Sequence, residues 1–364
     1  MRLEQQPASA TSSIRIRPTT VGMGEIADPS QYSLPANPAN LLRADPARRA
    51  AVSFRGDGVT LAGHLYRPPT VAVGEPTPGV VMCGPISSVK EQTLPHYAER
   101  FSAAGYTVLT FDPRNFGESE GAPRFRYDPN QVIADYSCAV SYLITRSDID
   151  PENVAAVGVC MGGGYAVSLG ARDKRLKAVV SIAGGYDIGG TFQQFLGVEG
   201  FAAYLRQVND LVQRQYETGE IAYIPTIAEA LTDRVPVAVM PNPEAFSYYD
   251  RTGRDEAPNW SRTLTADSLE SYFGYNSVIH APLVAPTPLQ IIHGTTDTAL
   301  LPEHAQRVYD AAQGAKELVW LDTHNHIELY DQDPYVSAAA GHALRWLDRY
   351  LGAESPVQEQ DLRL

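Results

Sequence analysis

Residues 154–165 read VAAVGVCMGGGY, and this stretch decides the fold of the chain. Its first half is apolar and predicts a short buried strand, which passes through Gly-x-Cys-x-Gly-Gly into a helix rich in Ala, Val and Leu. Glycines two positions before and after Cys160 are typical of a nucleophile elbow, because they let a strand-to-helix turn close tightly. Cys160 then lies over a helix N-terminus, which favours a thiolate. The alternative is a buried cysteine that only packs in a strand–loop–helix unit, a common arrangement in α/β proteins.

A cysteine nucleophile needs a base, and the base needs a carboxylate that orients it; after an elbow of this kind they follow in the order acid, then histidine. Residues 289–297 read LQIIHGTTD and predict a strand that ends in a loop carrying Asp297. Residues 317–321 predict the last strand, and His326 follows it. Each of the three side chains comes just after a predicted strand, at the edge where open parallel sheets form their sites. The sequence therefore predicts a Cys160–His326–Asp297 triad.

Other residues compete for these roles. His324 is the alternative base, Asp187 is the second choice for the acid, and Asp322 is the third. Residues 117–121 read GESEG and also match Gly-x-Ser-x-Gly. We do not expect Ser119 to be a nucleophile, because no strand leads into it and no apolar helix follows. The two neighbouring histidines lack further ligands at zinc spacing, so no metal is expected.

Two more stretches accompany the elbow: VKEQ at residues 89–92 and FDPRNFGESEG at 111–121. Together these motifs resemble the α/β-hydrolase superfamily, in particular its dienelactone-hydrolase-like branch and the bacterial and fungal hydrolases that include polyketide transferases. The resemblance covers about residues 52–351. It implies a doubly wound, mostly parallel eight-stranded sheet with a helical lid inserted after the sixth strand. Asp112 and Arg114 are expected to stabilise the loops rather than to take part in chemistry.

The resemblance also implies roles for individual residues. It favours His326 over His324, because in relatives a hydrophobic residue and then an acidic or small one follow the base. It implies an oxyanion hole formed by the N–H of Met161 and by one N–H from the loop at 84–88. Proline in that loop has no N–H, so Ile86 is the expected donor and Ser87 the second choice.

The order of strand and helix patterns divides the chain. They alternate over 46–187 and 281–352, which predicts a parallel, doubly wound core. The alternation fails over 188–280, which predicts a helical lid insertion. Residues 1–45 predict an N-terminal arm that is flexible or draped on a partner, and 353–364 predict a C-terminal tail.

Within the expected lid, apolar residues recur at helical spacing over 201–212, and shorter helical pieces are expected at 227–231 and 245–249. Most of its aromatic rings are expected to form the lid's own core. Tyr249, Trp260 and Tyr272 are the candidates for contact with a substrate.

Composition narrows the function. A net charge of −13 argues against nucleic acid and anionic membranes as partners. The three cysteines imply no disulfide framework, and we see neither a signal peptide nor a run of 18 apolar residues. We therefore expect a cytoplasmic protein, and a homodimer is left open.

These features predict an acyl-transfer enzyme that forms an acyl-cysteine on an ester, lactone or thioester and needs no cofactor. We expect a hydrolase or an acyltransferase of polyketide or secondary metabolism. Its partner would be a small-molecule or carrier-bound acyl substrate. The alternatives are an isomerase, cyclase or lyase that uses the same pocket without acylation, and a binding protein without catalysis.

Overall fold

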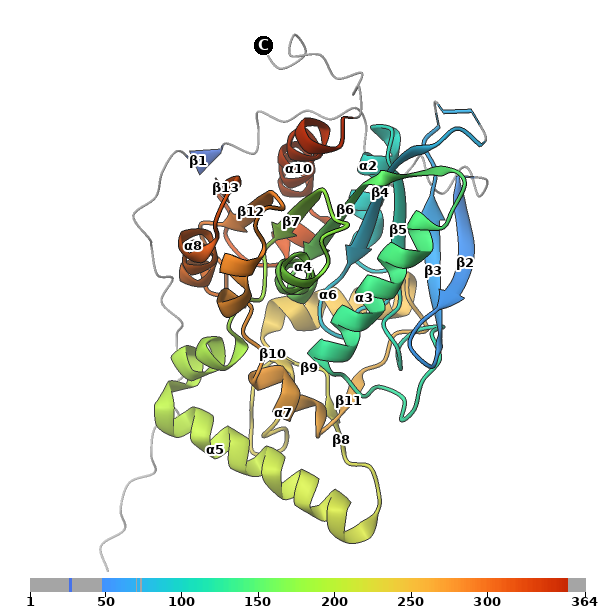
Figure 1. Ribbon diagram of the computed structural model, residues 1–364. Helices are drawn as coiled ribbons and strands as arrows, with labels where there is room; N and C mark the ends of the chain where they lie inside the picture. The colour runs from blue at the N-terminus through green and yellow to red at the C-terminus, as the bar shows by residue number, and fades with distance from the viewer. Residues whose placement is uncertain (1–25, 28–47, 70, 73, 353–364) are drawn as a thin grey trace, which may run out of the picture.

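The computed structural model describes residues 26–27, 48–69, 71–72 and 74–352, and one large sheet runs through it (Figure 1). Across the sheet the strands follow the order β1-β13-β12-β7-β6-β4-β5-β3-β2. The pairs β2–β3 and β3–β5 are antiparallel, and all other neighbours are parallel. This confirms the predicted doubly wound, mostly parallel sheet. Its eight long strands are β2 (Arg49–Arg55), β3 (Thr60–Tyr66), β4 (Thr77–Cys83), β5 (Thr107–Phe111), β6 (Ile149–Val159), β7 (Ala178–Ile182), β12 (Leu289–Gly294) and β13 (Lys316–Leu321).

A ninth strand, β1 (Ile26–Ala27), pairs in parallel with β13. It falls within the arm predicted at 1–45, where the sequence shows no strand pattern. The rest of that arm and the tail at 353–364 lie outside the described residues.

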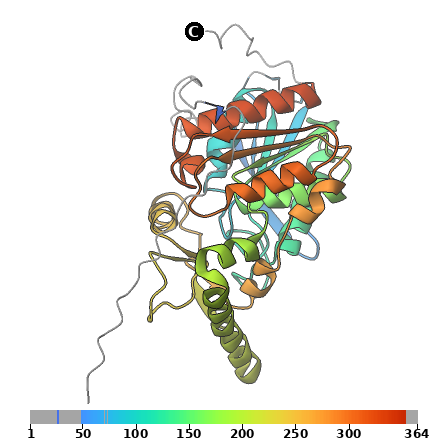
Figure 2. The ribbon, with the colours of Figure 1, turned by 90° about the vertical axis from the view of Figure 1, so that its left-hand side faces the viewer.

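Helices cover both faces of the sheet. On one face α10 packs against α2, and on the other α3 packs against α4, with α8 following beside them (Figures 1 and 2). Every residue of β5, β7 and β12 is buried, as expected for strands of a sheet with two covered faces. The helices of the core are α2 (Leu94–Ala103), α3 (Pro129–Ile144), α4 (Met161–Arg172), α8 (Pro302–Ala311), the short α9 (Glu328–Asp331) and α10 (Tyr335–Leu351).

A long insertion connects β7 to β12. Its first helix, α5, extends away from the sheet (Figure 2) and is kinked at Gly197, where φ is 71°. The prediction of a helical piece at 227–231 is wrong, because β9 occupies part of this range and pairs with β10. Movement of this insertion as a lid stays a prediction. The insertion contains α5 (Ile188–Thr218), β8 (Tyr223–Pro225), β9 (Ile227–Ala228), β10 (Met240–Pro241), α6 (Pro243–Asp255), β11 (Thr263–Thr265), α7 (Ser268–Phe273) and the 3-10 helix η2 (Val278–Leu283).

Three general features of the described residues bear on function. None of their helices combines the length and apolarity needed to cross a bilayer. Among the same residues, no cluster of three His, Cys, Asp or Glu side chains is arranged to hold a metal ion. All three cysteines are free thiols, and Cys83 and Cys160 are buried.

Candidate active site

Cys160 lies in the sharp turn between β6 and α4, with φ 58° and ψ −123°. A Cβ on Gly158 would lie 1.8 Å from the carbonyl oxygen of Gly162, and a Cβ on Gly162 would lie 2.0 Å from that of Cys83. Only glycine therefore fits two positions before and two positions after the cysteine. A non-glycine residue with positive φ is strained, and the packed glycines hold Cys160 in that conformation at the N-terminus of α4.

Asp297 and His326 follow β12 and β13, the two strands beyond β7. Oδ1 of Asp297 accepts hydrogen bonds from the backbone N–H groups of Ala299 (2.8 Å) and Leu300 (2.7 Å). Its Oδ2 lies 2.6 Å from Nδ1 of His326. Both side chains are buried. The backbone thus fixes the carboxylate, and the carboxylate orients the imidazole.

The charges in this buried group support one another. Burial by itself lowers the pKa of His326, but the charges of Asp297 and Cys160 and hydrogen bonds to both outweigh it and raise the pKa to about 10. Burial by itself raises the pKa of Asp297, but His326 and the loop N–H groups keep it below its ordinary value. Asp297 therefore makes the imidazole of His326 a stronger base.

The geometry separates the predicted residues from their competitors. The side chain of His324 is 75% exposed and pairs with Glu328. Asp187 caps the N-terminus of α5 and pairs with Arg307 at 3.1 Å. Asp322 accepts a 3.4 Å hydrogen bond from a threonine hydroxyl. The carboxylate bound to His326 is that of Asp297.

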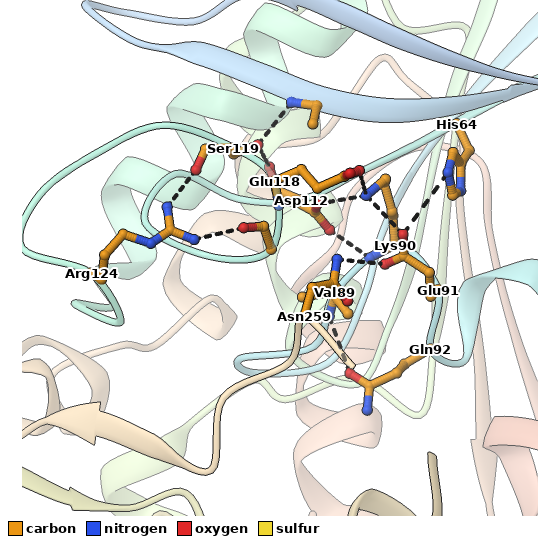
Figure 3. Close-up of polar contacts among 12 residues, drawn as sticks. His64, Val89, Lys90, Glu91, Gln92, Asp112, Glu118, Ser119, Arg124 and Asn259 are labelled. Atoms are coloured by element: carbon orange, nitrogen blue, oxygen red, sulfur yellow. Dashed lines mark hydrogen bonds and ion pairs between the residues drawn. The ribbon is translucent and has the colours of Figure 1, made fainter. Parts of the chain in front are cut away.

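Ser119 has a structural environment. Its hydroxyl donates to the carbonyl oxygen of Asp112 (2.7 Å) and accepts from the backbone N–H of Ala62 (2.8 Å). Its own carbonyl accepts a hydrogen bond from Arg124 (Figure 3). These bonds fix the loop after β5. None of these partners is a histidine that could act as a base for the hydroxyl.

A cavity of about 440 Å³ opens over the thiol. The insertion between β7 and β12 supplies much of its wall, including Tyr272. Apolar side chains predominate, which suits an acyl chain. The lining comprises Ile86, Cys160, Phe192, Phe195, Leu196, Ala230, Leu231, Val239, Met240, Pro241, Asn242, Ala245, Tyr272, Thr298, Ala299, Leu300, His326, Ile327 and Tyr330.

Two of the three aromatic candidates are not part of this lining. Tyr249 and Trp260 stack on each other, with ring centroids 5.1 Å apart and ring planes 19° apart. The Tyr249 hydroxyl forms a 2.8 Å hydrogen bond with that of Ser88. Neither ring lines the cavity, and direct contact of Tyr249 and Trp260 with a substrate stays a prediction.

The two expected oxyanion donors, Met161 and Ile86, belong to the elbow and to the loop after β4. Met161 is the first residue of α4, and the first N–H groups of a helix have no partner within it. Ile86 is buried and lines the cavity. Ser87, the second choice, has a φ of 59°, and its buried hydroxyl has no hydrogen-bond partner among the described residues.

An ionic network around the buried Lys90 supports the loop that carries Ile86 (Figure 3). Nζ of Lys90 lies 2.9 Å from Asp112, 2.6 Å from Glu118 and 2.8 Å from Glu91. The backbone N–H of Lys90 also donates to Asp112 at 2.7 Å. A buried charge needs such partners, so the network ties the loop after β4 to the loop after β5.

Asp112 and Arg114 have different partners in these loops. Asp112 pairs with Lys90, whereas Arg114 pairs with Asp135 at 2.7 Å on α3. The two residues therefore stabilise the loops separately. Neither is among the residues that line the cavity.

Tyr330 is the residue of this site that the sequence reasoning missed. Its hydroxyl lies 3.1 Å from Nε2 of His326, and its side chain lines the cavity. The signal in the sequence is its position four residues after His326, which places both side chains on one face of a helical turn.

Comparison with known proteins identifies the family. The family model described as serine aminopeptidase, S33, a hydrolase family, matches residues 90–333. The chain belongs to this family. The family is named after serine, whereas the elbow of this chain carries a cysteine, Cys160.

Individual proteins that resemble this chain indicate where in the family it lies. The thiohydrolase aneE of Aspergillus aculeatus is 29% identical over 74% of this chain and 83% of the relative. The polyketide transferase claH of Penicillium crustosum is 27% identical over 72% of this chain and 84% of the relative. The solved structure of DcsB with its substrate analogue superposes with a TM-score of 0.72, at 20% identity, over 83% of this chain and 99% of that one. The chain is thus an enzyme of the α/β-hydrolase fold with relatives in polyketide chemistry.

Proposed function

We propose that this chain is an acyl-transfer enzyme that forms an acyl-cysteine at Cys160. The observation that carries the proposal is the meeting of the Cys160 elbow, the Asp297–His326 pair and an apolar cavity at one place. The names of aneE and claH support a thioester or polyketide acyl group as the donor.

The reaction begins with the thiol. His326 accepts the proton of Cys160 at Nε2, while Asp297 holds Nδ1 and balances the imidazolium charge. The thiolate attacks the acyl carbonyl, and the N–H groups of Met161 and Ile86 stabilise the oxyanion. The leaving group departs with the proton from His326, and an acyl-cysteine remains.

The second half of the reaction transfers the acyl group. An alcohol or amine of a small-molecule acceptor, or water, gives its proton to His326 and attacks the thioester carbon of acyl-Cys160. Collapse of the tetrahedral intermediate returns the thiolate. Because the cavity wall is largely apolar, it limits the access of water and favours transfer over hydrolysis.

The test uses an octanoyl N-acetylcysteamine thioester with and without a primary alcohol. The wild type should release the thiol and, with alcohol present, form the ester. Cys160→Ala should abolish both products, whereas the matched variant Cys138→Ala, on α3 and half-buried, should keep them. Turnover by Cys160→Ala would overturn the proposal in favour of a reaction without acylation. A wild type that neither turns over the thioester nor carries an acyl group would overturn it in favour of a binding function.

A further inference from the structure

The hydroxyl of Tyr330 lies beside Nε2 of His326, the ring nitrogen that does not bond to Asp297. The distance from the hydroxyl to Nε2 is 3.1 Å, and from Asp297 Oδ2 to Nδ1 it is 2.6 Å. Tyr330 is about 1% exposed, and its ring meets the imidazole edge-on at 5.1 Å. Packing therefore fixes the position of the Tyr330 hydroxyl.

Cys160 lines the same cavity as Tyr330 and His326. Cys160 also contributes to the raised pKa values of both side chains. The phenol hydroxyl that contacts the base is therefore also near the nucleophile. A hydroxyl can donate one hydrogen bond and accept others, so it can serve both groups at once.

We propose that Tyr330 is a fourth catalytic residue, whose hydroxyl donates to the Cys160 thiolate and accepts from the protonated Nε2 of His326. In this step the S–H bond of Cys160 breaks and an N–H bond forms at Nε2. The O–H bond of Tyr330 stays intact and turns from the imidazole to the sulfur. Hydrogen bonds to a charged partner are the strong ones, so the phenol stabilises the ion pair more than the neutral pair.

Burial supports this role, because it raises the pKa of Tyr330 well above its ordinary value. The phenol thus stays protonated in the neutral range and remains a donor. The hydroxyl of Tyr249 adjoins that of Tyr330 and bonds to Ser88. This chain links the ion pair to the loop that carries Ile86.

Other ionisable groups around Cys160 do not compete in the neutral range. Burial raises the pKa values of four groups near Cys160: the thiol of Cys83 on β4 and the phenols of Tyr127 before α3, Tyr249 on α6 and Tyr272 on α7. Burial lowers the pKa of His293 on β12, the imidazole next to His326.

The inference rests on the proposed function, and Tyr330→Phe tests it. The variant removes the hydroxyl and keeps the ring that packs on Tyr248 at 5.0 Å. The rate of Cys160 alkylation by iodoacetamide should reach its midpoint about one pH unit higher than in the wild type. The kcat/KM for the octanoyl thioester should fall about tenfold or more.

Tyr248→Phe is the matched control. It removes a buried phenol hydroxyl from the same aromatic cluster, one that bonds to Thr93 at 2.8 Å and is not among the cavity-lining residues. A merely structural role of Tyr330 predicts that both variants lower the melting temperature and that neither moves the alkylation profile. The proposal predicts that only Tyr330→Phe moves it.

Further variants separate the possible failures. An unmoved profile in Tyr330→Phe, together with a shifted one in His326→Asn, overturns the role of Tyr330 and leaves the acyl-cysteine function standing. An unmoved profile in both variants overturns the function itself. Should Tyr330→Phe not fold, Tyr249→Phe decides: a smaller shift in the same direction supports the proposal, and an unmoved profile overturns it.

Discussion

Ala245→Leu should shorten the acyl chain that the enzyme accepts. Ala245 lies on α6, is 3% exposed and lines the cavity of about 440 Å³ over Cys160. Leucine extends the wall by about three carbon atoms and displaces a similar number of substrate methylenes. Each buried methylene contributes about 0.8 kcal/mol, so the longest chains should lose about 2.4 kcal/mol, or roughly 50-fold in kcat/KM. Acetyl transfer should be nearly unchanged.

The assay is kcat/KM for a series of N-acetylcysteamine thioesters from acetyl to dodecanoyl. Trp260→Phe is the control, because Trp260 belongs to the same insertion but is not among the residues that line the cavity. It should leave the chain-length profile as it is in the wild type. If Ala245→Leu keeps its fold by circular dichroism and shows the wild-type profile, the acyl chain does not bind in this cavity and the reasoning is wrong.

Two further predictions follow from the burial of individual side chains. His326→Asn should lower kcat/KM by about 10³-fold or more, whereas His324→Asn, which loses one exposed ion pair, should change it less than about fivefold; the reverse order would reassign the base. Burial raises the pKa of Glu99 to about 8, so the folded chain holds a proton there that the unfolded chain releases above about pH 4.5. Stability from this group is present below that pH and is lost as pH rises through about 8, so Glu99→Gln should gain on the wild type by about 1.4 kcal/mol per pH unit in that window. Urea unfolding at several pH values checks this, with the exposed Glu152→Gln as control; parallel curves for Glu99→Gln and the wild type would contradict it.

Local patterns carried much of the fold. Gly158 is required by a contact within its own turn, with Gly162, so the turn can be predicted from the local sequence, although Gly162 also meets the distant Cys83. The alternation of buried strands and helices gives the parallel sheet for the same reason. The two-residue strand β1 has no such pattern, because its pairing with β13 depends on a distant partner.

The wall of the cavity could not be predicted in this way. Tyr249, Trp260 and Tyr272 are equivalent as aromatic residues of one insertion, and only tertiary packing turns Tyr272 toward the cavity and stacks the other two on each other. The partners of Lys90 are likewise 22 and 28 residues away. Tyr330 falls between these cases, since its spacing from His326 is visible in the sequence but its contact with Cys160 is not.

The central claim is an acyl group on the sulfur of Cys160, and intact-mass measurement tests it most directly. The wild type is mixed with the octanoyl thioester, quenched in acid within milliseconds to seconds and weighed, and the modified peptide is mapped. We expect one added octanoyl group on the peptide that contains Cys160. The adduct should accumulate only slowly in His326→Asn and should be missing in Cys160→Ala. An adduct on Ser119 or Cys83, or turnover with no adduct at any quench time, would contradict it.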